Sequence, residues 1–433
     1  MERLALMPKY EAYKDSGVEW IGAIPVHWNS FPLCAKSKLK SISNNENEEL
    51  LSVYLDKGVI KFDDVDAKRT NTTSSDLTKY QLVDPGDFVL NNQQAWRGSV
   101  GVSDYRGIVS PAYLVLSLSE DIVPRFGNYL FRDGAMVANY LVSSKGVGTI
   151  QRNLYWPQLK RALVFLPPTE EQLLIACFLD KKTAKIDEAI SIKEKQISLL
   201  KERKQIIIQQ AVTQGLDPNV PMKDSGVDWI GKIPAHWDIV PGFTVFKEGK
   251  DSNKGMIESQ VLSLSYGNII IKPEEKLVGL VPESFETYQI ALPGDIIIRC
   301  TDLQNDKTSL RTGIVRNKGI ITSAYLNLRL KTEHSAEFMH YFLHVLDITK
   351  TIYRFGSGLR QNLSYKDFKH MRILMPPKAE QIEIVNYINN QVEVTESSID
   401  LIKNKIEKLK EYKTTLINSA VTGKIKITPE MVE

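Results

Sequence analysis

The chain has 433 residues, of which 42% are hydrophobic and 25% are charged, and its formal net charge is +3. This length predicts two to four domains, and no apolar run approaches the roughly 18 residues that a membrane-spanning helix needs. The small net charge neither identifies nor excludes a nucleic-acid-binding face, because a face is not visible in a sum.

The N-terminal region and the cysteines indicate a cytoplasmic protein. The first 15 residues contain no apolar stretch of signal-peptide length. Cys34, Cys177 and Cys300 lie far apart and form no C-x-x-C pair, which argues against a zinc site and against a disulfide framework. We expect each cysteine to be a small buried hydrophobic residue, and we expect no metal site in the chain.

An internal repeat is the main feature of the sequence. Residues 14–28 read KDSGVEWIGAIPVHW and residues 223–237 read KDSGVDWIGKIPAHW, so 12 of 15 positions are identical at an offset of 209 residues (223 − 14). A similar offset separates further landmarks, which are PGD at 85 and 293, AYL at 112 and 324, NL at 153 and 362, PP at 167 and 376, and EQ at 171 and 380. The chain is therefore a tandem duplication.

The first part of each repeat predicts a mostly-β domain. Short runs rich in β-branched and aromatic residues, such as LLSVYL from Leu50 and DIIIRC from Asp295, alternate with turns such as DPGD and LPGD. We expect one helix in each copy, within GNYLFRDGAMVANYL from Gly127 and AEFMHYFLHVL from Ala336.

The second part of each repeat predicts a long helix. Residues 169–214 and 378–422 contain neither Gly nor Pro and are rich in helix-forming residues. Gly215 and Gly423 stand where a helix C-terminal stop is expected. In the first copy we consider a break near residues 180–183, which would give a short helix followed by a long one.

Both long helices carry a heptad seam with alternating spacings of four and three residues, the pattern of a coiled coil. The seam positions are Ile186, Ile190, Lys193, Ile197, Leu200, Lys204, Ile207 and Ala211 in the first copy, and Thr395, Ile399, Ile402, Ile406, Leu409, Lys413, Leu416 and Ala420 in the second. Two matching seams favour an intramolecular antiparallel pair. At about 1.5 Å per residue the rod spans roughly 40–50 Å, comparable with one turn of B-DNA at about 34–36 Å.

These patterns predict the α+β class, with two mostly-β domains, two long helices in an antiparallel coiled coil, and internal pseudo-two-fold symmetry. The predicted divisions are an N-terminal tail (1–13), a first β-rich domain (14–168), a central helical region (169–214), a second β-rich domain (215–377), a C-terminal helical region (378–423) and a C-terminal tail (424–433).

Polar loops that differ between the copies are candidates for reading DNA, since Asn and Gln pair with adenine and Arg pairs with guanine. The first copy offers Asn91, Asn92, Gln93, Gln94 and Arg97, and the second offers Arg299, Gln304, Asn305, Lys307 and Arg311. A second pair of loops, rich in glycine, offers Lys145, Gln151 and Arg152, and Arg354, Arg360 and Gln361, which could contact phosphates or bases. Because these loops are similar in both copies, they favour a role in positioning or structure over sequence choice. The alternative is that these segments are solvated turns.

The repeated opening stretch predicts packing more than base stacking. Its tryptophans, Trp20, Trp28, Trp229 and Trp237, have apolar neighbours and are shared by the copies. We interpret the stretch as a clasp that joins each β-rich domain to the helices, with structural roles for His27 and His236.

We find no catalytic motif. Residues 226–232 match G-x-x-x-x-G-K, but a phosphate-binding loop needs Ser or Thr next, and the next residue is Ile233. The sequence shows neither a convincing glycine loop for S-adenosylmethionine nor an N-P-P-Y-type tetrapeptide of adenine methylation.

The duplicated SGVxWIGxIPxHW, the PGD and AYL landmarks, PPTEEQ with PPKAEQ, and the twin helices resemble the specificity subunit of type I restriction–modification systems, the HsdS family. The resemblance covers nearly the whole chain. It implies two target-recognition domains that read the halves of an asymmetric, bipartite double-stranded DNA site, with helices that set the spacer and dock two methyltransferase subunits.

The resemblance also implies that the chain is not catalytic alone. Adenine-N6 methylation and cleavage would belong to methyltransferase and restriction subunits, which would bind S-adenosylmethionine, ATP and Mg²⁺. Two other interpretations stay open from the residues alone: a coiled-coil scaffold whose β-rich domains bind proteins, and a free-standing DNA-modifying enzyme.

Overall fold

The structure is a computed structural model in which two compact units are distinguished. Unit 1 comprises residues 1–193 and 403–433, and unit 2 comprises residues 194–402. The residues that the structure describes are 6–55, 57–64, 76–147, 151–273, 284–301, 303, 310–331, 333–355 and 362–433.

Unit 1 is built on antiparallel strands, with a central four-stranded sheet in the order β4-β11-β8-β9. Two-stranded pairs β1-β2, β14-β3, β10-β7, β5-β6 and β12-β13 surround it. The strands are β1 (Tyr13–Asp15), β2 (Ala23–Pro25), β3 (Asn29–Pro32), β4 (Ser37–Lys40), β5 (Leu51–Tyr54), β6 (Gly58–Lys61), β7 (Gln81–Val83), β8 (Phe88–Asn91), β9 (Val100–Val102), β10 (Gly107–Val109), β11 (Tyr113–Leu118), β12 (Ser144–Val147), β13 (Gln151–Leu154) and β14 (Leu163–Leu166).

Unit 2 repeats this plan in the same chain order, with the central sheet β18-β25-β22-β23 and the pairs β15-β16, β17-β26, β21-β24 and β19-β20. Its strands are β15 (Met222–Asp224), β16 (Lys232–Pro234), β17 (Asp238–Pro241), β18 (Phe246–Glu248), β19 (Leu262–Ser265), β20 (Asn268–Ile271), β21 (Gln289–Ala291), β22 (Ile296–Ile298), β23 (Thr312–Ile314), β24 (Gly319–Ile321), β25 (Leu326–Leu330) and β26 (Arg372–Met375).

Short helices complete each unit. They are η1 (Leu33–Ala35), η2 (Phe62–Asp64), η3 (Ala95–Arg97), α2 (Pro124–Arg132), α3 (Gly134–Val142) and α4 (Trp156–Leu159) in unit 1, and α6 (Gly242–Val245), α7 (Ala336–Ile348), η5 (Thr351–Phe355) and α8 (Tyr365–Phe368) in unit 2; η6 (Pro429–Met431) follows the last long helix. The prediction of a single helix from Gly127 is wrong. Asp133 separates α2 from α3, because its backbone is extended and its carboxylate accepts a hydrogen bond from the Ala135 amide as an N-cap.

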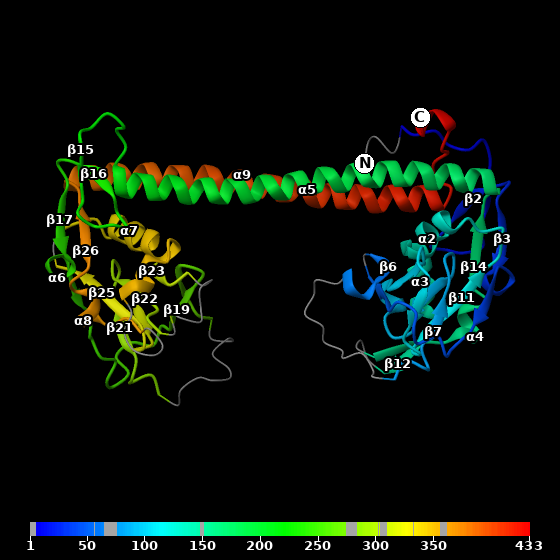
Figure 1. Ribbon diagram of the computed structural model, residues 1–433, viewed down its shortest axis with the longest axis horizontal. Helices are drawn as coiled ribbons and strands as arrows, with labels where there is room; N and C mark the ends of the chain where they lie inside the picture. The colour runs from blue at the N-terminus through cyan, green and yellow to red at the C-terminus, as the bar shows by residue number, and fades with distance from the viewer. Residues whose placement is uncertain are drawn as a thin grey trace. The chain divides into compact units, whose positions relative to one another are not determined.

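Two long helices, α5 (Thr169–Gln214) and α9 (Lys378–Val421), confirm the helical prediction (Figure 1). The break considered near residues 180–183 is absent, and α5 is continuous. Tyr129 donates a hydrogen bond of 2.8 Å to Asp180, so that polar side chain is satisfied without leaving the helix. Gly215 and Gly423 both adopt left-handed backbones, with φ of 75° and 71°, and end the helices as expected.

The helices pair antiparallel inside each unit. In unit 1 the seam residue Lys413 contacts Asp187 at 2.7 Å, and in unit 2 the seam residue Lys204 contacts Glu396 at 2.5 Å. From the first ion pair to the second, α5 advances by 17 residues (204 − 187) while α9 retreats by 17 (413 − 396). The α+β class with two mostly-β parts and an antiparallel coiled coil is thus confirmed.

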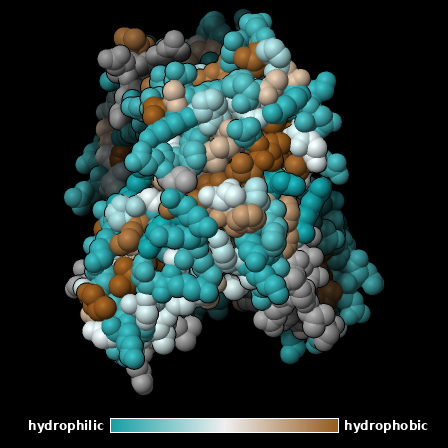
Figure 2. Space-filling view, turned by 90° about the vertical axis from the view of Figure 1, so that its left-hand side faces the viewer, coloured by the Kyte–Doolittle hydropathy of each residue, from teal (hydrophilic) through white to brown (hydrophobic). Residues whose placement is uncertain are grey.

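Each unit has its own hydrophobic core, which includes one end of the helix pair. In unit 1 the core extends from Trp28 and Phe88 to Leu416 and Ala420. In unit 2 it extends from Trp237 and Phe342 to Ile384. The surface of unit 2 that faces the viewer in Figure 2 is mainly hydrophilic, with hydrophobic side chains gathered in patches.

The three cysteines differ in their burial. Cys300 is buried and Cys177 is half-buried, but Cys34 is exposed, so the expectation of a buried residue is wrong there. Cys34 lies in the short helix η1, and its neighbour Leu33 is the residue there that packs into the core. Among the helices that the structure describes, none has the apolar length that a membrane crossing requires.

Candidate nucleic-acid interface

The repeated HW motif forms the same clasp in both units. The indole Nε1 of Trp28 donates to Glu171 Oε1 at 3.0 Å, and His27 Nε2 lies 2.8 Å from Glu171 Oε2. In unit 2, Trp237 and His236 contact Glu380 at the same two distances. Trp28 and Trp237 are fully buried. The Glu of each EQ landmark therefore ties a β-rich part to the first turn of a long helix.

The Gln of each EQ landmark fixes the entrance to that helix. Gln172 donates from Nε2 to the carbonyls of Asp121 and Pro167 at 2.8 and 3.0 Å, and it accepts from the Val123 amide at 2.9 Å. Gln381 makes the equivalent contacts, donating to the Pro376 carbonyl and accepting from the Ser335 amide. Both glutamines are buried. The shared landmarks thus act inside the fold.

The other two tryptophans of the repeat pack less deeply. Trp229 is half-buried and its ring centroid lies 6.0 Å from that of Phe342. Trp20 is 50% exposed, so the packing prediction is wrong at this position. The turn that carries Trp20 lies on the surface, whereas Trp28 points at the helix.

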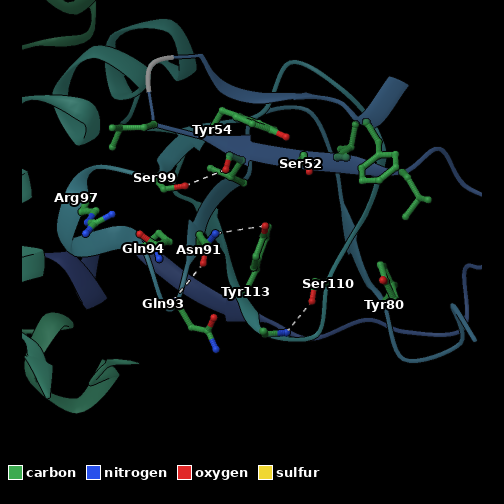
Figure 3. Close-up of a pocket in the computed structure, with 16 residues that line it drawn as sticks. Ser52, Tyr54, Tyr80, Asn91, Gln93, Gln94, Arg97, Ser99, Ser110 and Tyr113 are labelled. Atoms are coloured by element: carbon green, nitrogen blue, oxygen red, sulfur yellow. Dashed lines mark hydrogen bonds between the residues drawn. The ribbon is translucent and has the colours of Figure 1, made fainter. Parts of the chain in front are cut away.

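The loop with Asn91, Gln93, Gln94 and Arg97 borders a cleft of about 520 Å³ in unit 1 (Figure 3). Three tyrosines share this cleft with it: Tyr54 at the end of β5, Tyr80 before β7 and Tyr113 at the start of β11. Asn91 Nδ2 donates to Tyr113 Oη at 3.4 Å, and Asn91 Oδ1 accepts from the Gln93 amide at 3.2 Å. Asn91, Gln93, Gln94 and Arg97 are therefore brought together as one polar wall.

Asn92 points elsewhere. Its side-chain Oδ1 accepts from the Leu154 amide at 2.9 Å, which ties the loop after β8 to strand β13. This contact gives Asn92 a structural role, and the base contact predicted for it has no support from its position.

Cations stack on aromatic rings beside this loop. The Arg97 guanidinium lies 4.6 Å from the centre of the Trp96 ring, and the Arg152 guanidinium lies 5.7 Å from the same ring. Lys145 Nζ lies 3.7 Å from the centre of the Tyr155 ring. Arg97 and Lys145 are exposed, so the cations are oriented by aromatic contacts and stay available to phosphates. Gln151 lies in β13, next to Arg152.

In unit 2, Arg311 is a structural residue. It is fully buried, and its guanidinium donates to Tyr353 Oη at 3.1 Å and to the carbonyls of Thr301 and Arg299 at 2.8 and 3.2 Å. The predicted DNA contact at Arg311 is wrong, because these donors hold the segments around β23 together. Arg299 is half-buried directly after β22, and Arg354 is exposed in η5.

The remaining predicted residues of unit 2 lie outside the described residues. They are Gln304, Asn305, Lys307, Arg360 and Gln361. Among the residues that are described, no three His, Cys, Asp or Glu side chains are grouped as metal ligands would be.

The helix seam is buried or half-buried throughout. Ile186, Ala211, Ile399, Ile406, Leu416 and Ala420 are buried, and Ile190, Ile197, Leu200, Ile207, Ile402 and Leu409 are half-buried. Lys204 and Lys413 each form an ion pair with an acidic residue of the other helix.

The chain is similar in sequence to a named protein. No family model matches it. A protein of Methanocaldococcus jannaschii, provisionally named the specificity subunit of the type I restriction enzyme MjaX, is 24% identical over 384 residues, or 81% of each chain. The resemblance to type I specificity subunits is confirmed.

Two solved structures share the fold of this chain. One is the HsdS subunit from Thermoanaerobacter tengcongensis, with a TM-score of 0.53 and 17% identity, covering 93% of this chain and 98% of that chain. The other comes from work on complex assembly and conformational transition of the type I R-M system; its TM-score is 0.65 at 16% identity, covering 92% and 98%.

Sequence reasoning missed the tyrosines of the cleft. Tyr54, Tyr80 and Tyr113 lie far apart in the chain and read as ordinary strand residues. The alternation in β5, where Leu51 and Val53 are buried and Ser52 and Tyr54 are half-buried, is the one local signal that a side of this strand faces an opening.

Proposed function

We propose that the chain is the DNA sequence-specificity subunit of a type I restriction–modification complex. The β-rich part of each unit would read one half of an asymmetric, bipartite double-stranded site. The supporting observation is that one architecture is built twice on shared internal hydrogen bonds, while equivalent surface positions carry different polar side chains.

Asn91 and Arg299 are the clearest such pair. Leu90 pairs with Leu114 in unit 1 and Ile298 pairs with Leu326 in unit 2, so Asn91 and Arg299 follow at the same place in the two central sheets. Asn suits the donor and acceptor of adenine, and Arg suits the two acceptors of guanine. Because the two domains are fused and different, the site they read is asymmetric.

The helix pair has an apolar outer surface that suits partner helices. Ile192, Leu199 and Ile206 on α5 are exposed at steps of seven residues, and so are Tyr387, Val394 and Leu401 on α9. Ordinary surface helices do not repeat exposed apolar residues in heptads, whereas helices that receive a further helix do. We assign these stripes to the docking of methyltransferase subunits.

The repeat accounts for two copies of that partner. Ile192 and Leu401 are related by the 209-residue offset, and so are the exposed Leu173 and Ile382. These two pairs of equivalent apolar positions would contribute to two docking sites, one for each copy of the partner. The methyltransferase subunits would bring S-adenosylmethionine, restriction subunits would bring ATP and Mg²⁺, and the assembly would work in the cytoplasm without catalysis by this chain alone.

Mapping of methylated adenines in host DNA, with and without this gene, tests the proposal. A bipartite methylated motif that disappears with the gene is expected. Methylation by the purified chain with DNA and S-adenosylmethionine alone would instead identify a free-standing enzyme. DNA affinity that does not fall with salt would favour the protein-binding scaffold, because phosphate contacts release counterions.

The helices would also set the spacer of the site. Insertion of one heptad in both α5 and α9 is expected to lengthen the unread spacer in the methylated motif or to abolish binding. An unchanged motif would contradict this role of the helices.

A further inference from the structure

The cleft bordered by Tyr54, Tyr80 and Tyr113, here called the tyrosine cleft, is a hollow on unit 1. Residues of β5, among them Leu51 and Val53, also border it. Its volume of about 520 Å³ lies in the range of small-ligand sites. The cleft is therefore a well-formed pocket whose walls are partly aromatic and partly apolar.

One wall of the tyrosine cleft is polar and has unused hydrogen-bonding capacity. Gln93 and Gln94 line it, and neither side-chain amide has a hydrogen-bond partner among the described residues. Asn91 is held in place by Tyr113, and the exposed Arg97 adds a cation at the same wall. Amide groups offer a donor and an acceptor side by side, the pattern that the edge of a nucleobase requires.

We propose that the tyrosine cleft holds one nucleobase turned out of the duplex in the first half-site. The proposal rests on the proposed function and deepens it, because it assigns a ligand class to a part of unit 1. The base would lie against Tyr54 and Tyr80, and its edge would meet the amides of Asn91 and Gln94.

The shape of the site favours a single base over a stacked base pair. Side chains that read a duplex project into a groove from a convex surface. A hollow lined by three tyrosines receives instead a flat group that has left the stack. Aromatic stacking and edge hydrogen bonds would offset the cost of unpairing and unstacking.

The phenols converge closely enough to influence one another. Burial raises the pKa of Tyr113, and the nearby phenols of Tyr54 and Tyr80 raise it further. The Tyr113 hydroxyl therefore stays neutral at physiological pH and can donate or accept hydrogen bonds inside the cleft.

Unit 2 differs at one of the three tyrosines. Tyr54 is the last residue of β5, and the last residue of the equivalent strand β19 is Ser265. The second half-site is therefore expected to lack this effect, which provides an internal control.

Mismatch scanning of the mapped DNA site tests the proposal with the full-length chain. Each base of the first half-site is kept in turn while its partner is replaced by a mismatched base. Extrusion costs less from a mismatch, so binding is expected to tighten about tenfold at one position. At the other positions, and throughout the second half-site, mismatches are expected to weaken binding.

Matched variants identify the cleft as the cause. Tyr54→Ala is expected to abolish the tightening, whereas Tyr54→Phe keeps the ring and the effect, and Ser265→Ala in unit 2 leaves it unchanged. If Tyr54→Ala does not fold, Gln94→Ala decides, because this half-buried amide contributes little to packing. Full tightening in Gln94→Ala and in a folded Tyr54→Ala would overturn the proposal.

The base pocket and the proposed function can be disproved separately. Weaker binding at every mismatch, with the matched site still preferred, overturns the base pocket and leaves the proposed function standing. Absence of any preference for the mapped site over unrelated DNA overturns both.

Discussion

The two units use the same residues to hold their folds and different residues where the surface can bind. The clasp keeps its chemistry and its distances, since Trp28 with Glu171 and Trp237 with Glu380 are both joined at 3.0 Å. At the ends of β8 and β22, by contrast, the equivalent positions are occupied by different residues, Asn91 in unit 1 and Arg299 in unit 2. A duplicated chain thus separates scaffold from function without any second sequence for comparison.

The PGD turns show an intermediate case, in which the interaction is kept and the residue has moved. In unit 1 Lys40 of β4 contacts Asp87 at 2.5 Å. In unit 2 Arg329 of β25 contacts Asp295 at 2.8 Å. Both carboxylates also accept the amide at the start of their own turn, from Asp84 and Leu292. A buried carboxylate needs a cation nearby, but different strands of the central sheet can supply it.

The largest expected effect comes from exchanging residues 29–150 for the recognition domain of another protein of this fold. Because each unit has a separate core, only the first half of the methylated motif should change. Each mismatched base pair costs about 1–3 kcal/mol, so the original half-site should lose more than about 100-fold in affinity. A change in both halves, seen by mapping methylated adenines, would contradict the independence of the units.

A charge placed in the helix seam should be the next largest effect. Ile399 is buried and Leu401, two residues away, is exposed. Ile399→Asp should destabilise the chain by about 3 kcal/mol or more in chemical denaturation, since it buries a carboxylate without a partner. Leu401→Asp should leave stability unchanged and weaken binding of methyltransferase subunits. Equal unfolding curves for the two variants would exclude the seam.

Removing the clasp should distinguish the units by degree. Glu171→Ala and Glu380→Ala each leave a buried indole N–H without an acceptor, at a cost of about 1–3 kcal/mol. The cost should be larger for Glu171, which also accepts a hydrogen bond from Tyr10 at 2.5 Å. Denaturation monitored by tryptophan fluorescence measures this, with the exposed Glu170→Ala as control. A larger loss for Glu380→Ala would show that Tyr10 adds nothing.

Asn91→Arg should change one base pair of the target. Arg at this position matches the residue of unit 2 and should convert a preference for adenine into one for guanine, worth about 1–3 kcal/mol in DNA binding. Asn92→Ala is the matched control, because Asn92 bonds to the Leu154 amide and should affect stability alone. If the two variants altered the motif alike, the assignment of Asn91 would fail.

Acid should weaken unit 2 more than unit 1, which contains one histidine, His27, against five in unit 2. Burial lowers the pKa of His340 to about 3, helped by His344 and Arg316, and lowers that of His344 to about 4, helped by Lys204. The ordinary histidine pKa is near 6.5. As pH falls below that value the unfolded chain takes up protons that the folded unit does not, so stability decreases.

The measurement for this last and smallest effect is urea denaturation at pH 7 and pH 5. His344→Gln, which cannot be protonated, should show a shallower loss between the two values than the natural chain. An identical loss in both proteins would mean that His344 is not responsible.

Much of the fold was predictable because its signals are local. The helices of 46 and 44 residues could be predicted from the absence of Gly and Pro and from the glycines that follow them. The clasp was predictable because a repeated Trp with apolar neighbours predicts packing. The split at Asp133, the exposure of Cys34 and the burial of Arg311 were not, since each depends on neighbours distant in the chain.

The sequence by itself determined the duplication, the pairing of the helices and the set of polar loops, because periodicity and repetition are properties of order along the chain. Only the tertiary structure decided which polar residues act. It turned Asn92 and Arg311 inward and gathered Asn91 and Gln94 with three tyrosines around one cleft. A site made of side chains from separate strands exists only when packing brings those strands together.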